Sequence, residues 1–103
     1  MLSGMAVMVE FEVRGVTPEQ LYEVEQRTTE RGEALGRPPY DGLVFLAVSP
    51  RDDAFRFVSV WRTEEAFAVA LDSMLAPDLA AVGAVVSDVV VGPVMSMAIP
   101  GDH

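Results

Sequence analysis

The sequence predicts an α+β fold of the ferredoxin-like β-α-β-β-α-β type, with a four-stranded antiparallel sheet and both helices on one face. Three observations lead to this fold. Residues 5–13, 43–49, 55–61 and 84–99 have strand-like patterns, and residues 18–35 and 64–75 have helical ones. The order of these elements forms two βαβ-like halves of similar length. The chain length of 103 residues predicts a single domain over residues 1–103.

The first half contains a strand and an amphipathic helix. Apolar side chains occupy the odd positions from Met5 to Val13, which predicts a strand with one buried face. Thr17 then offers a helix N-cap, and the next positions complete a capping box with Pro18 and Gln20. The helix that follows has a predicted inward stripe of Leu21, Val24, Thr28 and Leu35.

The second half begins after the bend-forming segment Gly36–Gly42. Residues 43–49 are apolar on both alternating faces, so we expect a central strand that is covered on both sides. Residues 55–61 follow as its hairpin partner, with Phe55, Phe57, Ser59 and Trp61 on one face.

The remaining elements are a second helix and a last strand. Thr63 is the predicted cap of the second helix, Pro77 should end or kink it, and residues 78–83 can add a further turn or two before Gly83 closes the segment. The last predicted strand covers residues 84–99. We expect a bulge or a sheet edge near Gly92-Pro93, because proline cannot donate to a central ladder.

The composition excludes several classes of function. The net charge of −9 disfavours nucleic acid and anionic membrane surfaces as partners. The absence of cysteine removes disulfides, thiolate metal sites and cysteine nucleophiles, and the one histidine is the terminal His103. We therefore predict neither a metal nor another cofactor. With no signal-peptide pattern and no apolar run of membrane-spanning length, the expected location is the cytoplasm.

The predicted sheet has a second face that two helices cannot cover. That face carries one of the two alternating sets of residues 43–49, and each set is too apolar to remain in water. A second copy of the chain is the simplest cover, so the expected partner is the chain itself, in a homodimer.

Residues 40–83, "YDGLVFLAVSPRDDAFRFVSVWRTEEAFAVALDSMLAPDLAAVG", resemble the antibiotic-biosynthesis-monooxygenase-like proteins, the dimeric α+β barrels. The shared features are the Gly-Leu start of the second strand, an acidic turn, a strand ending in tryptophan, a polar cap and an acidic helix start leading to an aromatic residue. The resemblance implies two sheets joined into a barrel, with a pocket between each sheet and its helices. Some members oxidise aromatic polyketides with molecular oxygen and no cofactor, and others bind or degrade haem or small carbonyl compounds.

Three positions of the chain can be matched to the quinone-forming members. Trp61 corresponds to the tryptophan that lines their pocket. Phe57 stands where those members carry a polar amide, and Phe67 stands where they carry a tyrosine. The resemblance thus implies a pocket lined by Trp61, Phe57 and Phe67 whose shape is kept and whose polar groups are replaced.

Four polar residues complete the candidate site. Tyr40 lies at the mouth of the second predicted strand, where a hydroxyl could transfer a proton or simply pack in a loop. Glu10 shares a strand face with Glu12, and the pair could be working acids or a solvated rim. Ser59 has no internal histidine as a base, so we expect it to line the pocket. Thr28 could bond back to a carbonyl of its own helix or point its hydroxyl into a cavity.

Three functions are compatible with these residues. The first is a cofactor-independent monooxygenase acting on an aromatic or polyketide-like compound held against Trp61. The second is a non-catalytic module that binds a small aromatic or apolar ligand in the same pocket. The third is a structural or regulatory homodimer whose core is filled by Phe57, Trp61 and Phe67.

Overall fold

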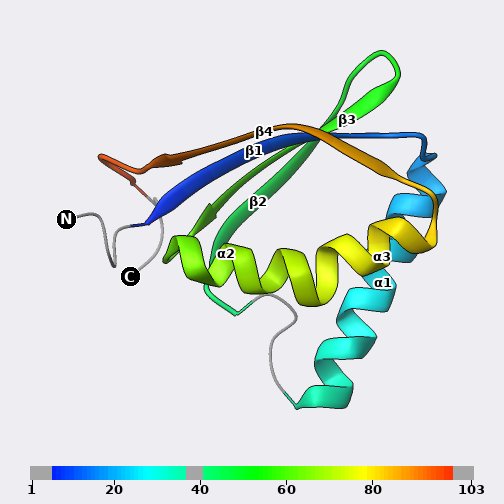
Figure 1. Cartoon of the computed structure of the whole chain (residues 1–103), viewed down its shortest axis with the longest axis horizontal. Helices are drawn as coiled ribbons and strands as arrows, with labels where there is room; N and C mark the ends of the chain where they lie inside the picture. Colours follow the sequence, from blue (N-terminus) through cyan, green and yellow to red (C-terminus); the bar gives the residue numbers. More distant parts are fainter. Residues whose placement is uncertain (1–5, 37–40, 99–103) are drawn as a thin grey trace.

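The computed structural model describes residues 6–36 and 41–98, with only the backbone of Leu35 and Met74. Its elements follow the predicted order: β1 (Val7–Arg14), α1 (Pro18–Leu35), β2 (Leu43–Pro50), β3 (Ala54–Trp61), α2 (Glu64–Ala70), η1 (Leu71–Leu75), α3 (Ala76–Ala81) and β4 (Val85–Pro93). The strands form one antiparallel sheet in the order β2-β3-β1-β4. The helices all lie on one face of this sheet (Figure 1). The ferredoxin-like α+β fold is therefore confirmed.

The helix starts form as the sequence predicts. Thr17 caps α1 in a complete capping box: the Thr17 side chain accepts from the backbone N–H of Gln20, and the Gln20 side chain accepts from the backbone N–H of Thr17. Thr63 caps α2 by accepting from the N–H of Ala66 at 3.0 Å. Both caps satisfy N–H groups that a helix end leaves unpaired.

The strand β2 does not occupy the predicted central position. It lies at the edge of the sheet, beside β3 only, and six of its eight residues are exposed. Its doubly apolar pattern has another cause. Leu46 and Val48 face the helical layer and line a cavity there, whereas Phe45 lies on the open face of the sheet and is 50% exposed. The alternation of residues along a strand shows which of its faces are apolar, and it does not show whether the strand has one neighbouring strand or two.

The last strand is shorter than predicted and lies at the opposite edge, so the edge expected at Gly92-Pro93 is confirmed. The bulge is elsewhere. Between Glu10 and Glu12 of β1 the pairing with β4 shifts by one residue, and Asp88 adopts φ 56° at this point. Aspartate tolerates the left-handed region better than most residues, which fits it to the extra position of a bulge.

The second helical segment contains a π-turn, η1, just before Pro77. Proline has no N–H to donate to the carbonyl four residues earlier, which is that of Ser73. The Ser73 carbonyl instead accepts from Nη1 of Arg31 on α1 at 3.3 Å. The proline therefore neither ends the helix nor leaves its freed carbonyl unpaired, because a side chain of α1 takes that bond.

The main core lies between the sheet and the helices. The odd-numbered residues of β1 are all buried and pack with residues of β3, α2 and α3. Gly42 lets the start of β2 approach α2 closely, since a Cβ added there would lie 2.7 Å from the Cβ of Ala66. The described residues include no helix long and apolar enough to cross a membrane.

Candidate functional site

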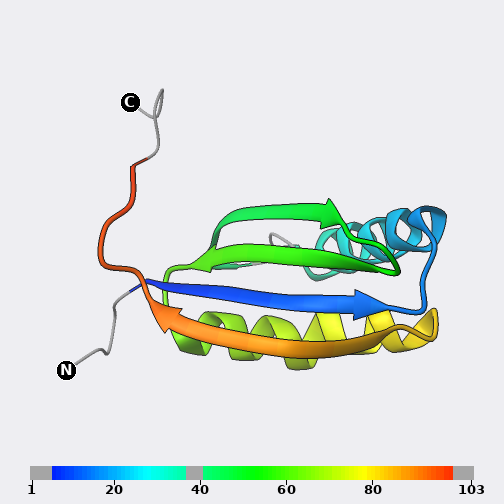
Figure 2. The ribbon, with the colours of Figure 1, turned by 90° about the horizontal axis from the view of Figure 1, so that it is seen from above.

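A cavity of about 720 Å³ opens between α1 and the β2–β3 hairpin. In Figure 2, α2 lies beneath β1 and β4, whereas α1 lies towards the β2 and β3 side. The described lining comes from α1, the hairpin and η1, and consists of Pro18, Leu21, Tyr22, Val24, Glu25, Thr28, Thr29, Leu46, Val48, Pro50, Phe55, Phe57 and Leu75. The volume is in the range of ligand pockets, and most of these side chains are apolar.

The cavity has a buried floor and an exposed rim. The floor residues are Val24, Thr28, Phe57 and Leu75. The rim residues are exposed and include Tyr22, Glu25, Thr29, Leu46, Val48 and Pro50. Because the sheet-side rim belongs to an edge strand, the cavity opens at the β2 edge of the sheet.

Two parallel stripes of α1 line the cavity. Leu21, Val24 and Thr28 form the inner stripe, and Tyr22, Glu25 and Thr29 form the outer one. Each stripe has the i, i+3, i+7 spacing of one helix face, and the two faces are about 100° apart. The inner stripe is apolar except for one hydroxyl, whereas the outer stripe is polar throughout.

A buried polar cluster fixes α1 next to the cavity. Asp78 of α3 is 2% exposed and accepts from Oγ1 of Thr28 at 2.8 Å and from Nη2 of Arg31 at 2.5 Å. The Thr28 hydroxyl, in a side chain that is 1% exposed, also lies 3.0 Å from the Val24 carbonyl oxygen, so its one proton is shared between Asp78 and its own helix. We call Asp78, Thr28 and Arg31 the α1–α3 clamp. Asp78 was not identified from the sequence pattern, because its partners lie 47 and 50 positions away.

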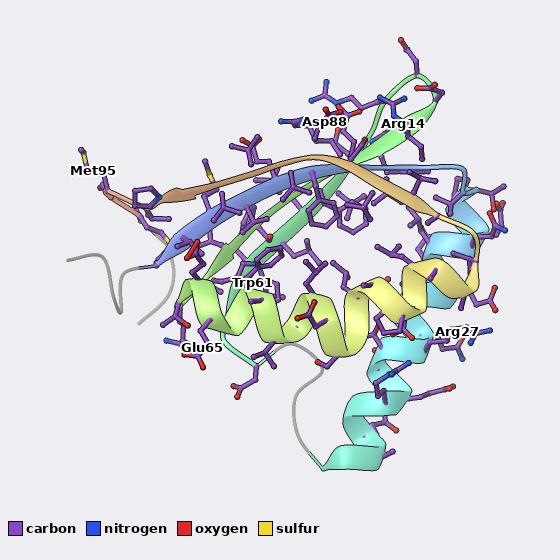
Figure 3. The ribbon with its side chains drawn as sticks, in the orientation of Figure 1. Arg14, Arg27, Trp61, Glu65, Asp88 and Met95 are labelled. Atoms are coloured by element: carbon purple, nitrogen blue, oxygen red, sulfur yellow. The ribbon has the colours of Figure 1, made fainter. Side chains whose placement is uncertain are left out.

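The predicted pocket residues fall into two groups. Phe57 and Thr28 line the cavity. Ser59, Trp61 and Phe67 are buried in the neighbouring part of the core. The rings of Trp61 and Phe67 pack 5.6 Å apart, and Nε1 of Trp61 donates to Oγ of Ser59 at 2.9 Å. Figure 3 shows Trp61 between the sheet and α2. These three side chains lie in the layer between α2 and the sheet, whereas the cavity lies against α1.

Glu10 lies on the other side of the sheet from the cavity. Its carboxylate pairs with Arg56 at 3.2 Å, and Arg56 also pairs with Glu12 at 3.3 Å. The ladder continues from Glu12 through Arg14 to Asp53, with both distances 2.6 Å. Asp53, and to a smaller extent Glu12, raise the pKa of the Arg14 guanidinium above its ordinary value. Figure 3 shows Arg14 and Asp88 on this open face. Tyr40 lies outside the described residues.

The structure adds two polar candidates that sequence reasoning missed, Tyr22 and Glu25. Their spacing of three within the helix pattern was visible, but nothing in the sequence showed which face of α1 borders an open space. Among the described residues, no three His, Cys, Asp or Glu side chains gather in a group suited to a metal ion.

No protein-family model matches the chain, and no curated protein matches it in sequence. Solved structures do match its fold. SnoaB, a cofactor-independent oxygenase from Streptomyces nogalater, has a TM-score of 0.62 at 16% identity, over 93% of this chain and 98% of SnoaB. A protein of Chloroflexus aurantiacus J-10-fl, provisionally described as an antibiotic biosynthesis monooxygenase, has a TM-score of 0.55 at 14% identity, over 92% and 99% of the two chains.

The de novo designed protein Foldit4 also matches, with a TM-score of 0.53 at 13% identity over 84% of this chain and 96% of the design. Because an oxygenase and a designed protein share this architecture, the fold by itself assigns no activity. The chain therefore shares the fold of SnoaB and of the Chloroflexus protein.

Proposed function

We propose that the chain holds a small aromatic or polyketide-like compound in the cavity beside α1 and acts on it in the manner of the cofactor-independent monooxygenases. The observation that carries this proposal is the apolar cavity of about 720 Å³, with an aromatic floor at Phe57. Phe57 is itself supported by Phe11, whose ring stacks on it at a centroid distance of 5.0 Å. A planar apolar ligand gains by leaving water for such a surface.

The reaction of that class needs no electron donor other than the substrate. With an anthrone as substrate, a ring methylene is oxidised to a carbonyl by one molecule of oxygen, and the second oxygen atom leaves as water. The protein must hold the substrate and accept a proton. Glu25 is the only carboxylate among the described lining residues, so it is the group that would accept this proton.

A non-catalytic binding module is the second candidate, and one observation favours it. Among the described residues, no buried side-chain nitrogen or oxygen lacks a hydrogen-bond partner. The Thr28 hydroxyl on the floor is engaged by Asp78 and the Val24 carbonyl, so the deep part of the cavity offers no unoccupied group for proton transfer.

Binding is tested with Nile red, a neutral apolar dye whose emission rises in apolar surroundings. We expect the wild type to bind it and Val48→Trp to lose most of that binding, because the indole fills the mouth of the cavity. Val69→Trp is the matched control, since Val69 is similarly exposed but lies on α2, away from the cavity. Equal binding by both variants would exclude the cavity as the site. No binding by the wild type would favour the structural role.

Catalysis is tested separately by oxygen uptake with 1,8-dihydroxyanthrone. Uptake in the wild type that is lost in Val48→Trp and kept in Val69→Trp supports the oxygenase. Binding of Nile red without uptake across a panel of anthrones and hydroquinones assigns the chain to the binding class instead.

We propose also that the working form is a homodimer joined through the open face of the sheet. The open face exposes Met8, Phe45 and Val90 at 43%, 50% and 56%, next to the ion-pair ladder that runs from Glu10 to Asp53. An apolar patch bordered by charges of both signs is suited to a second copy of itself. Phe45→Glu should give a monomer in sedimentation equilibrium, and Val69→Glu should not. A monomeric wild type would exclude the dimer.

A further inference from the structure

The floor and the rim of the cavity differ in the chemistry that they offer to a ligand. On the floor, the described polar atoms are already paired within the protein, through the α1–α3 clamp and the Val24 carbonyl. A polar ligand group placed there would lose its water and find no partner, which is costly. The floor therefore accepts the apolar part of a ligand only.

The rim is polar on the α1 side alone. Tyr22, Glu25 and Thr29 follow one another along the outer stripe, opposite the apolar Leu46 and Val48 of β2. Among the described residues, the Glu25 carboxylate makes no ion pair and no hydrogen bond. Its neighbour one turn on, Thr29, directs its hydroxyl to the Glu25 carbonyl at 3.0 Å and so does not occupy the carboxylate.

The charge at the rim has one sign. The described lining includes one carboxylate and no arginine, lysine or histidine. The arginines nearest in sequence are engaged elsewhere: Arg27 pairs with Glu23 at 3.0 Å, and Arg31 pairs with Asp78. Figure 3 shows Arg27 on the outer side of α1. A ligand carboxylate at the rim would face Glu25 without a balancing cation.

From these contrasts, and resting on the proposed function, we infer that Glu25 selects ligands with an apolar body and a hydrogen-bond-donating end, and rejects carboxylates. The apolar body lies against Phe57 and the donor, a hydroxyl, reaches Glu25 at the rim. Glu25 thereby also fixes which end of the ligand enters first. A hydrogen bond to an ionised acceptor is stronger than one between neutral groups, which makes the rim the source of selectivity.

The test compares three ligands that share one ring system: 2-naphthol, 2-methoxynaphthalene and naphthalene-2-carboxylate. Each is titrated into the full-length chain by calorimetry at pH 7, where the naphthol is neutral. The wild type should bind 2-naphthol about tenfold more tightly than the methoxy compound, which is the size of effect expected from one charge-assisted hydrogen bond. The carboxylate should bind most weakly.

Two variants assign the selectivity to Glu25. Glu25→Ala should bring the affinities for the three ligands together, to within about twofold, while leaving the affinity for 2-methoxynaphthalene unchanged. Glu30→Ala is the control, because it removes the same charge from an exposed position of the same helix that does not line the cavity. Alanine is favourable within a helix, so both variants should keep α1 intact.

Two results would overturn the inference, and only the second would also overturn the proposed function. If the wild type binds all three ligands equally, or if Glu30→Ala alters selectivity as much as Glu25→Ala does, then Glu25 is not the selecting group and the cavity remains a binding site. If none of the three ligands binds, the proposed function fails and the inference fails with it.

Discussion

The two helices cover the same face of one sheet, yet the space beneath them differs. Beneath α2 the layer is closed, with Trp61, Phe67 and Ser59 buried and in contact. Beneath α1 a cavity opens, and polar contacts of the clamp join α1 to α3 there. Apolar side chains favour close packing of the two surfaces without voids, whereas a hydrogen bond or ion pair has a defined distance between its donor and acceptor atoms. The cavity thus lies where polar contacts join α1 to α3, and the filled core lies under α2.

The largest effect is expected from a substitution in the closed layer beneath α2. Trp61→Ala should lower the free energy of unfolding by about 3–5 kcal/mol, since it empties a filled site and leaves the Ser59 hydroxyl without its donor. Urea unfolding followed by circular dichroism measures this, because the variant lacks the only tryptophan of the chain. Trp61→Phe should stay folded and still bind Nile red. Loss of dye binding in Trp61→Phe would mean that Trp61 is a wall of the binding site.

The clamp is the next test. Asp78→Ala should cost about 2–3 kcal/mol, because it removes a buried acceptor of two hydrogen bonds, one of them charged. Thr28→Val keeps the shape of the floor but loses one bond, so it should cost about 1 kcal/mol. If the clamp sets the position of α1, Asp78→Ala should also bind Nile red more weakly than the wild type. This loss should be seen at temperatures where the variant is still fully folded, so that unfolding does not explain it. Unchanged binding in the folded variant would show that α1 keeps its place without the clamp.

The smallest expected effect compares one helix cap in each half. Thr17→Ala and Thr63→Ala each remove a side-chain cap, and each should cost about 1 kcal/mol in thermal or urea unfolding. Only Thr17→Ala should weaken dye binding, by about twofold, because the first turn of α1 carries Pro18 and Leu21 of the lining. The rate of amide hydrogen exchange should rise in the first helical turn of each variant, where the cap is lost. An equal loss of dye binding in both variants would contradict this, because it would show that the start of α2 affects the cavity as much as the start of α1 does.

Local patterns predicted the elements well and their surroundings less well. The caps at Thr17 and Thr63 and the buried odd positions of β1 depend on neighbours within a few residues, so the sequence shows them directly. The edge position of β2 and the bulge at Asp88 depend on strand order and register, which no local pattern encodes. The partnership of Asp78 with Thr28 and Arg31 joins two distant helices and was likewise not foreseeable.

The candidate site was predicted in part for the same reason. Phe57 and Thr28 were identified as inward-facing residues, and they do line the cavity. Whether an inward side chain meets a ligand space or another side chain depends on how far α1 stands from the sheet. No local pattern gives that distance, so Glu25 and Tyr22 became candidates only when the position of α1 was known.

The opening of the cavity at the β2 edge has a consequence for the ligand saturation curve. The described lining lies on the helical side of the sheet, and the open face of the sheet points the other way. In the proposed homodimer, the cavity of each copy would face away from the interface. Saturation should follow a simple hyperbola with one ligand for each chain, and loading one copy should leave the affinity of the next unchanged.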